Sequence, residues 1–215
     1  MPKQYGRAPI LATGRGKGAV VSPRGVTIPD LRERLFAAAE RVVARDGAAA
    51  LTSRGVTAEA DCAKGVLHTH FAGLDEFVAE LVLDRFARSA RHAEALEAKV
   101  GQATVAENLQ EVVGALLDSL PPAVVGLAMT RPAAASHTRD GFQSGAPAFD
   151  AIQHAVSDYL QAEQDAGRFA AGRDVGAIAL ALVGTTHHLL LTRNFAPATD
   201  AAETVKRLLA VLTGS

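Results

Sequence analysis

The sequence predicts an all-α fold from three observations. Apolar residues recur every three or four positions along most of the chain, which is the period of an amphipathic helix. No segment alternates polar and apolar residues as a half-buried strand does, and no internal repeat is present. The chain is 48% hydrophobic, only 5% aromatic and without Trp, so its core is built from Ala, Leu and Val. Alanine-rich segments of this kind favour helices.

Charge is divided unevenly along the 215 residues. Residues 1–74 carry 11 Lys and Arg against 6 Asp and Glu, whereas residues 75–215 carry 11 against 17. Such asymmetry suggests that the N-terminal part meets an anion. Residues 1–29 contain no acid and several Gly and Pro, which predicts a flexible basic arm. The arm is either a solvated tail or a segment that follows DNA phosphates or the minor groove. Its basic residues are Lys3, Arg7, Arg15, Lys17 and Arg24.

Cysteine content and hydropathy indicate the compartment. Cys62 is the single cysteine, which excludes internal disulfides and thiolate metal clusters and fits a reducing compartment. The first 30 residues have Gly, Pro and charges where a secretory signal has an apolar core. The most apolar run, Val175–Leu191, contains two histidines and is at the short limit for a spanning helix. We therefore expect a cytoplasmic protein with no membrane segment.

Two N-terminal helices are predicted by their end signals. Asp30 is an N-cap residue with Glu33 three positions on, and Asp46-Gly47 ends the helix with a residue suited to the left-handed conformation. Thr52 is expected to cap a second helix from Ser53 to Ala60.

The rest of the chain is expected to hold longer helices. Their ranges are 74–98, 104–120, 123–129, 147–166, 174–193 and a last helix after Thr199 or Asp200. Pro147 is expected to open one of them, whereas residues 131–145 are expected to form a polar loop, either a pocket lid or a linker. The helix at 174–193 is apolar on nearly all sides, so both of its faces must be covered. We expect the chain's own core to cover one face and a second subunit the other.

The segment AKGVLHTHF at residues 63–71, here called the recognition segment, combines apolar anchors with outward polar residues. Leu67 and Phe71, four positions apart, are expected to fix it to the domain, with Cys62 as a small buried neighbour. Lys64 and Gly65 then lie at the start of a short helix. A helix in the major groove reads base edges with its N-terminal residues.

The order of these elements resembles the TetR family of bacterial transcriptional regulators. It comprises an amphipathic helix ending in Asp-Gly, a Thr-capped helix, a tight turn, the recognition segment and an acidic helix at residues 74–81. The resemblance implies a helix-turn-helix DNA-binding domain at residues 30–81 and a helical ligand-binding and dimerisation domain at residues 82–215. The DNA-contacting residues that it implies are Thr52, Arg54, Lys64, Gly65, Val66, His68, Thr69 and His70.

Four positions depart from the family pattern. Asp61 stands at the turn in place of Gly, and Ala63 replaces the usual Ser or Thr cap. His68 replaces Tyr, and Leu74 replaces a Lys that contacts phosphate in the family. These departures motivate an alternative function, a regulator-like protein–protein interaction module whose DNA-binding segment has degenerated.

By the same resemblance, the chain is a dimeric repressor that a small-molecule effector releases from a near-palindromic operator in double-stranded DNA. The expected dimerisation residues are Leu180, Leu182, Leu189, Leu190, Leu208 and Leu212. The candidate effector contacts are Phe142, Thr185, His187 and His188. The last three are otherwise hydrogen-bonded core or interface residues, and adjacent histidines on a helix are poorly placed to chelate one metal ion. We expect no cofactor and no enzymatic activity, since the sequence has no nucleophile elbow, P-loop, dinucleotide fingerprint or metal-ligand set.

Overall fold

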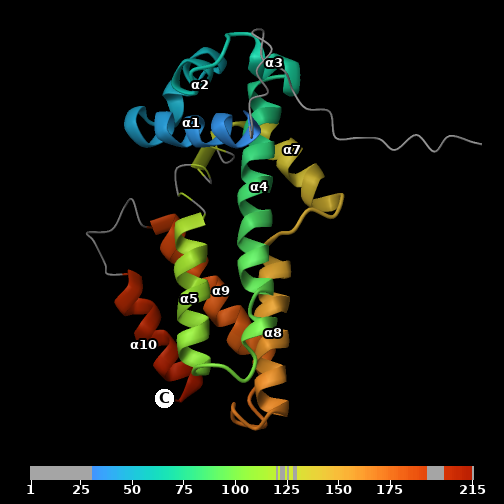
Figure 1. The fold of residues 1–215 in the computed structure, drawn as a ribbon, viewed down its shortest axis with the longest axis vertical. Helices are drawn as coiled ribbons and strands as arrows, with labels where there is room; N and C mark the ends of the chain where they lie inside the picture. The colour runs from blue at the N-terminus through green and yellow to red at the C-terminus, as the bar shows by residue number, and fades with distance from the viewer. Residues whose placement is uncertain are drawn as a thin grey trace, which may run out of the picture.

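The computed structural model describes residues 31–119, 121, 124, 126–127, 130–192 and 201–214, and these residues form helices and no strand, as predicted. Three N-terminal helices lie at one end of a long helix, and the remaining helices lie beside and below them (Figure 1). The helices are α1 (Leu31–Asp46), α2 (Ser53–Glu59), α3 (Val66–His70), α4 (Leu74–Glu94), α5 (Val105–Ser119), α7 (Pro132–Gln143), α8 (Phe149–Asp165), α9 (Val175–Thr192) and α10 (Ala201–Thr213).

The N-terminal unit, α1 to α3, is attached to α4 through three phenylalanine rings. Phe71, which follows α3, lies 5.0 Å from Phe77 of α4 and 6.2 Å from Phe36 of α1, measured between ring centroids. The Phe71–Phe77 pair is edge-to-face, and a pair of this kind adds to the free energy gained by burying the rings. The rings therefore set where α3 lies relative to the start of α4.

Helix α4 contacts elements from both halves of the molecule. Helices α7 and α8 pack along it, and α5 packs on its lower part (Figure 1). The helix ends at Glu94, short of the predicted residue 98, and a 3₁₀ turn at Glu97–Lys99 follows. The predicted capping box then opens α5, because Thr104 N donates to Glu107 Oε2 at 3.0 Å and Glu107 N donates to Thr104 Oγ1 at 3.2 Å.

Helices α5, α8, α9 and α10 form the lower bundle, with α9 packed against the other three. The buried amide of Asn108 donates to the hydroxyl of Tyr159 at 2.9 Å, which joins α5 to α8. Burial raises the pKa of Tyr159 to about 12, so this phenol stays protonated. In the described ranges, α9 is the one helix long and apolar enough to cross a membrane by length and composition. Its packing within the bundle accounts for its apolar inner face.

Two sequence-based predictions about this half of the chain are wrong. Residues 132–143 form helix α7, whereas a polar loop was expected. Pro132 occupies the first turn, and Ala134 and Thr138 are buried four positions apart, but the short polar outer residues concealed this periodicity. In addition, α8 begins at Phe149, so Pro147 precedes the helix and does not open it. The predicted caps Asp30, Thr199 and Asp200, and the arm at 1–29, lie outside the described residues.

Candidate DNA-binding surface and sensor region

Helix α2 begins at a side-chain cap. Thr52 has extended backbone angles, φ −133° and ψ 153°, and its Oγ1 accepts a hydrogen bond from Gly55 N at 3.0 Å. The cap predicted at this residue is therefore confirmed. Because Thr52 is exposed, its hydroxyl also faces solvent beside the recognition segment.

The turn between α2 and α3 is tight and well hydrogen-bonded. Asp61 adopts φ 51°, the left-handed conformation expected at this position, which Asp tolerates better than most residues. Cys62 N donates to Thr57 O at 2.9 Å, and Arg34 Nη2 donates to Ala60 O at 2.7 Å, which ties the turn to α1. The turn therefore forms without the usual glycine.

The recognition segment forms a short helix with no side-chain cap at its N-terminus. Gly65 precedes the first helical residue, Val66, and Val66 N donates to Ala63 O at 3.0 Å. The segment is held from below by its two predicted anchors, since Leu67 and Phe71 are 0% and 4% exposed. A five-residue helix is not stable by itself. Burial of Leu67 and Phe71 therefore stabilises it in place of the missing side-chain cap.

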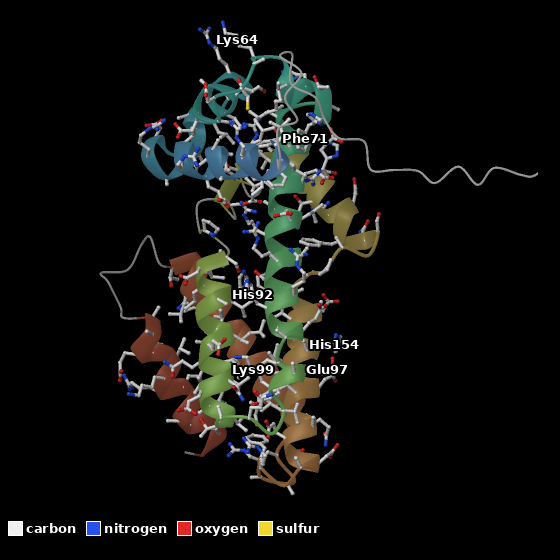
Figure 2. All side chains as sticks on the ribbon, viewed as in Figure 1. Lys64, Phe71, His92, Glu97, Lys99 and His154 are labelled. Atoms are coloured by element: carbon white, nitrogen blue, oxygen red, sulfur yellow. The ribbon has the colours of Figure 1, made fainter. Side chains whose placement is uncertain are left out.

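The polar side chains of the recognition segment face solvent. Lys64 lies at the tip of the molecule and points away from it (Figure 2). Val66 is half-buried. The exposed members of the predicted DNA-contacting set are Thr52, Arg54, Lys64, Gly65, His68, Thr69 and His70. The structure thus brings all eight predicted residues to one end of the molecule.

Ion pairing leaves this tip with unbalanced positive charge. Away from the tip, Glu59 accepts from Arg41 at 2.8 Å and from Arg45 at 2.9 Å, and these hydrogen bonds hold the pKa of Glu59 below its usual value. By contrast, the side chains of Arg54 and Lys64 have no hydrogen bond or ion pair with any described residue; at Arg54 it is the backbone carbonyl that accepts from Thr57 Oγ1. Unpaired cations on an exposed end provide the contacts that phosphates need.

The start of α4 departs from the family pattern in a physically clear way. Leu74 is half-buried and packs against the core, so this position contributes apolar contact where a phosphate-binding lysine was expected from the resemblance. The next two residues are acidic and lie in the first turn, where the helix dipole favours negative charge. Glu76 accepts from Ala72 N, and Asp75 Oδ1 accepts from Nε of Arg131, the N-cap residue of α7, at 2.6 Å.

A buried arginine joins α4 to α1. Arg85 is 3% exposed, and its guanidinium donates to Glu40 at 2.6 Å and to Glu33 at 3.1 Å. It also pairs with Asp84 at 2.7 Å. Burial lowers the pKa of Arg85, but the hydrogen bonds that it donates to Glu40 and Glu33 outweigh this effect and leave that pKa above its ordinary value. The charge is therefore permanent, and it fixes α1 on α4.

Four aromatic side chains, one each from α4, α7, α8 and α9, form a chain of ring contacts. The ring of Phe86 lies 5.2 Å from Phe142 of α7 and 4.8 Å from Phe149 of α8, both edge-on. The ring of Phe149 lies 4.4 Å from His187 of α9. Burial lowers the pKa of His187, so its imidazole is neutral near pH 7. These four residues are here called the aromatic cluster.

The aromatic cluster contains two of the four predicted effector contacts, Phe142 and His187. Thr185 is half-buried and His188 is exposed, so His188 points away from the helix side that carries His187. Phe86 and Phe149 were not predicted as site residues. Their apolar positions in helices indicated only core packing, and the contacts between them join distant parts of the sequence.

An open hollow of about 590 Å³ lies on the outer face of α5. Its lining residues are Glu107, Gln110, Glu111, Gly114, Ala115 and Asp118. Because they all belong to α5, this hollow contains none of the predicted effector contacts. Within the described ranges, no group of three or more His, Cys, Asp or Glu is placed to hold a metal ion.

The predicted dimerisation residues fall into two groups. Leu182, Leu189 and Leu190 are 1%, 9% and 2% exposed, so they pack inside the chain and not on its surface. This placement corrects the expectation for these three residues, because an all-round apolar helix does not reveal which face is inward. Leu180 is 58% exposed. Leu208 and Leu212 are half-buried.

A single exposed row, here called the outer stripe, runs along α9. It consists of Ala177, Leu180, Gly184, His188 and Leu191. Leu191 is 44% exposed, and Val211 of the neighbouring α10 is 74% exposed. Neither was predicted, although the three- and four-residue spacing from Leu180 indicates Leu191.

Comparison with known proteins identifies the fold. No protein-family model and no curated protein matches the sequence. A structure from Mesorhizobium loti, assigned to the TetR family of transcriptional regulators, has a TM-score of 0.64 and 15% identity, covering 86% of this chain and 95% of that one. FadR from Bacillus subtilis in complex with stearoyl-CoA has a TM-score of 0.57 and 16% identity, covering 84% and 97%. The multidrug binding protein EbrR, complexed with imidazole, has a TM-score of 0.53 and 26% identity, covering 86% and 96%. The chain therefore has the fold of the TetR-family transcriptional regulators.

Proposed function

We propose that this chain, with its TetR-family fold, is a cytoplasmic transcriptional regulator: a homodimeric repressor that a small-molecule effector releases from a near-palindromic operator. The observation that carries the proposal is the exposed end formed by α2 and α3. There, the side chains of Arg54 and Lys64 have no partner among the described residues, while Leu67 and Phe71 hold the recognition segment in place. A DNA-binding domain at residues 30–81 and a sensor and dimerisation domain at residues 82–215 follow from the same reading.

Each predicted residue has a role in this proposal. Gly65 lacks a side chain and lets the backbone approach the major groove, where Val66 can contact a thymine methyl group. His68 is assigned to the base edges. The phosphate contacts are assigned to Thr52, Arg54, Lys64, Thr69 and His70, because hydroxyl, guanidinium, ammonium and imidazole groups at the rim of a groove position the protein on the backbone.

Dimerisation is assigned to the outer stripe together with Val211 of α10. Exposed leucines at helical spacing leave apolar surface in contact with water, which is unfavourable unless a second helix covers them. Gly184 lies in the middle of the stripe, where a Cβ would meet nothing within 4 Å. A partner helix can therefore approach closely at this point. A symmetric pair of chains presents two recognition segments to successive turns of the major groove, about 34–36 Å apart.

The effector site is assigned to the aromatic cluster, because it joins four helices and offers one neutral imidazole among apolar rings. This composition favours a largely apolar ligand with a single hydrogen-bonding group. The fold neighbours support the same class of regulation, since one is described in complex with stearoyl-CoA and another as a multidrug binding protein. Coupling between effector and DNA is expected at roughly 1–3 kcal/mol.

A gel shift against the DNA upstream of the chain's own gene tests the proposal. Lys64→Ala should weaken binding, and the slope of log K against log salt should fall by about one per lost phosphate contact for Arg54→Ala. Arg139→Ala, which removes an exposed cation from α7, is the matched control and should change neither quantity. Absence of any shift at low salt would favour the alternative, an interaction module with a degenerate recognition segment.

Sedimentation of a Leu180→Glu variant tests the dimer separately. A charge in the outer stripe should shift the protein to monomers, because burying an unpaired carboxylate is unfavourable. His154→Glu places the same charge on the exposed face of α8 and should leave the dimer intact. A dimeric Leu180→Glu protein would contradict the assignment of this face.

A further inference from the structure

We propose that Arg131 and Asp75 form a positioning pair through which α7 braces the first turn of α4 and so holds the recognition segment at its working angle. The inference rests on the proposed function. It gives a route by which effector binding at the aromatic cluster can change the position of the DNA-binding end. Neither residue is expected to touch DNA or effector.

The upper attachment lies at the very start of α4. Arg131 Nε donates to Asp75 Oδ1 at 2.6 Å, and the two side chains are 30% and 39% exposed. Asp75 follows Leu74, the first residue of α4, and lies just beyond the anchor Phe71. An acidic residue in this first turn is already favoured by the helix dipole, so α4 does not need Arg131 in order to form. The specific effect of Arg131 is to join α7 to the end of α4 nearest the DNA.

The lower attachment lies about three turns further along α4. The ring of Phe142 meets Phe86 edge-on at 5.2 Å. Beside it, Gly141 lies so close to α4 that an added Cβ would overlap Leu83, with Leu83 Cδ2 at 3.0 Å. Helix α7 is therefore attached to α4 near both of its ends, by Arg131 at the upper end and by Gly141 and Phe142 at the lower end.

Through these two attachments, α7 connects the aromatic cluster to the end of α4 that carries the recognition segment. Its lower end belongs to the aromatic cluster, and its upper end holds Asp75. The N-terminal unit is fixed on α4 by the rings of Phe36, Phe71 and Phe77 and by Arg85 with Glu33 and Glu40. A shift of the first turn of α4 therefore moves the N-terminal unit with it. Movement of Phe142 by a ligand would be carried along α7 to Asp75.

A double-mutant cycle on the full-length protein tests the pair. The variants are Arg131→Gln, Asp75→Asn and both together, and the probe is the DNA duplex upstream of the chain's own gene. Each single variant should bind this DNA about two- to fivefold more weakly, as expected for a half-exposed ion pair, and the double variant should be no weaker than either. The salt slope should stay at the wild-type value. Arg131→Lys should restore part of the loss.

Two controls separate this role from others. Arg139→Gln removes an exposed cation from the same helix and should bind DNA as the wild type does. Amide hydrogen exchange tests the contact between Arg131 and Asp75 in the absence of DNA. The amides of residues 72–78 should exchange faster in Arg131→Gln and Asp75→Asn than in the wild type, while the exchange rates of residues 105–119 should not change.

The outcomes are distinct. Wild-type affinity in Arg131→Gln overturns the positioning pair, and so do additive losses in the double variant. A salt slope reduced by about one would make Arg131 a phosphate contact and also overturns it. If the wild-type protein fails to shift the DNA, the proposed function fails, and the exchange of residues 72–78 alone then decides whether the brace exists.

Discussion

Arg85 and Phe86 are adjacent in α4 but contact different parts of the molecule. The guanidinium of Arg85 is buried between Glu33 and Glu40 of α1, whereas the ring of Phe86 packs edge-on against Phe142 of α7 and Phe149 of α8. One turn of α4 therefore carries both the attachment of the N-terminal unit and the centre of the aromatic cluster. A small rotation of this turn changes both sets of contacts together.

Arg85→Gln should destabilise the protein strongly. Loss of the cation leaves Glu40 without a partner among the described residues and Glu33 paired with Arg88 alone, and breaking a buried ion pair in this way typically costs about 3–5 kcal/mol. Because both carboxylates are partly exposed, we expect about 2–4 kcal/mol, measured by urea unfolding. Arg88→Gln is the control. Arg88 is 39% exposed and also pairs with Glu33, so its loss should cost less than about 1 kcal/mol. Equal losses would contradict a structural role for Arg85.

Thr52 is expected to serve both the fold and DNA binding, and two substitutions separate these roles. Thr52→Ala removes the hydrogen bond from Gly55 N and should lower stability by about 1 kcal/mol. Thr52→Ser keeps the hydroxyl and should restore both stability and DNA affinity. Thermal unfolding and gel shifts are the measurements. If Thr52→Ala lost stability but kept full DNA affinity, the hydroxyl would be a helix cap alone.

Local signals in the sequence were sufficient for the candidate DNA-binding end. The cap at Thr52, the left-handed Asp61 and the anchors Leu67 and Phe71 each depend on a few neighbouring residues. Their placement could therefore be predicted one turn at a time. Helix α7 was missed because its buried side is narrow, with only Ala134 and Thr138 fully inside.

Contacts between distant helices could not be predicted in the same way. His187 is more than thirty residues from Phe149 and meets it only because α8 and α9 pack together. Helix α9 is apolar on both faces, so hydropathy does not distinguish Leu182, which is inside, from Leu180, which is outside. Burial in such a helix is decided by the neighbours against which it packs.

Two glycine-to-alanine substitutions should have opposite effects on stability. Gly114 of α5 has nothing within 4 Å of an added Cβ, so Gly114→Ala should gain about 0.5–1 kcal/mol from helix propensity. At Gly141, the added methyl group overlaps Leu83, and α7 or the leucine must move. We expect Gly141→Ala to lose about 1 kcal/mol despite its better helix propensity. Leu83→Ala combined with Gly141→Ala should show less than the sum of the two losses. Stabilisation by Gly141→Ala would show that α7 is not closely packed on α4.

His187 should make the stability of the protein depend on pH in the mildly acidic range. Burial lowers the pKa of His187 from 6.5, so the unfolded chain binds a proton at this residue more readily than the folded chain does. Stability is therefore complete above about pH 6.5 and is lost as the pH falls through the lowered pKa of the folded state. Glu59 and Glu107, whose pKa values are also lowered by hydrogen bonds, contribute only below about pH 4.5.

Urea unfolding at pH 7.5 and pH 5.5 isolates this contribution. The midpoint of the wild type should fall between these pH values, and that of His187→Gln should fall less, because glutamine does not titrate. His154→Gln is the matched control, since His154 is exposed on α8 and should leave the wild-type pH dependence unchanged. A fall in His187→Gln as large as that of the wild type would exclude His187 as its cause. Protonation of His187 also places a charge against the ring of Phe149, 4.4 Å away, so an apolar effector should bind the cluster more weakly at the lower pH.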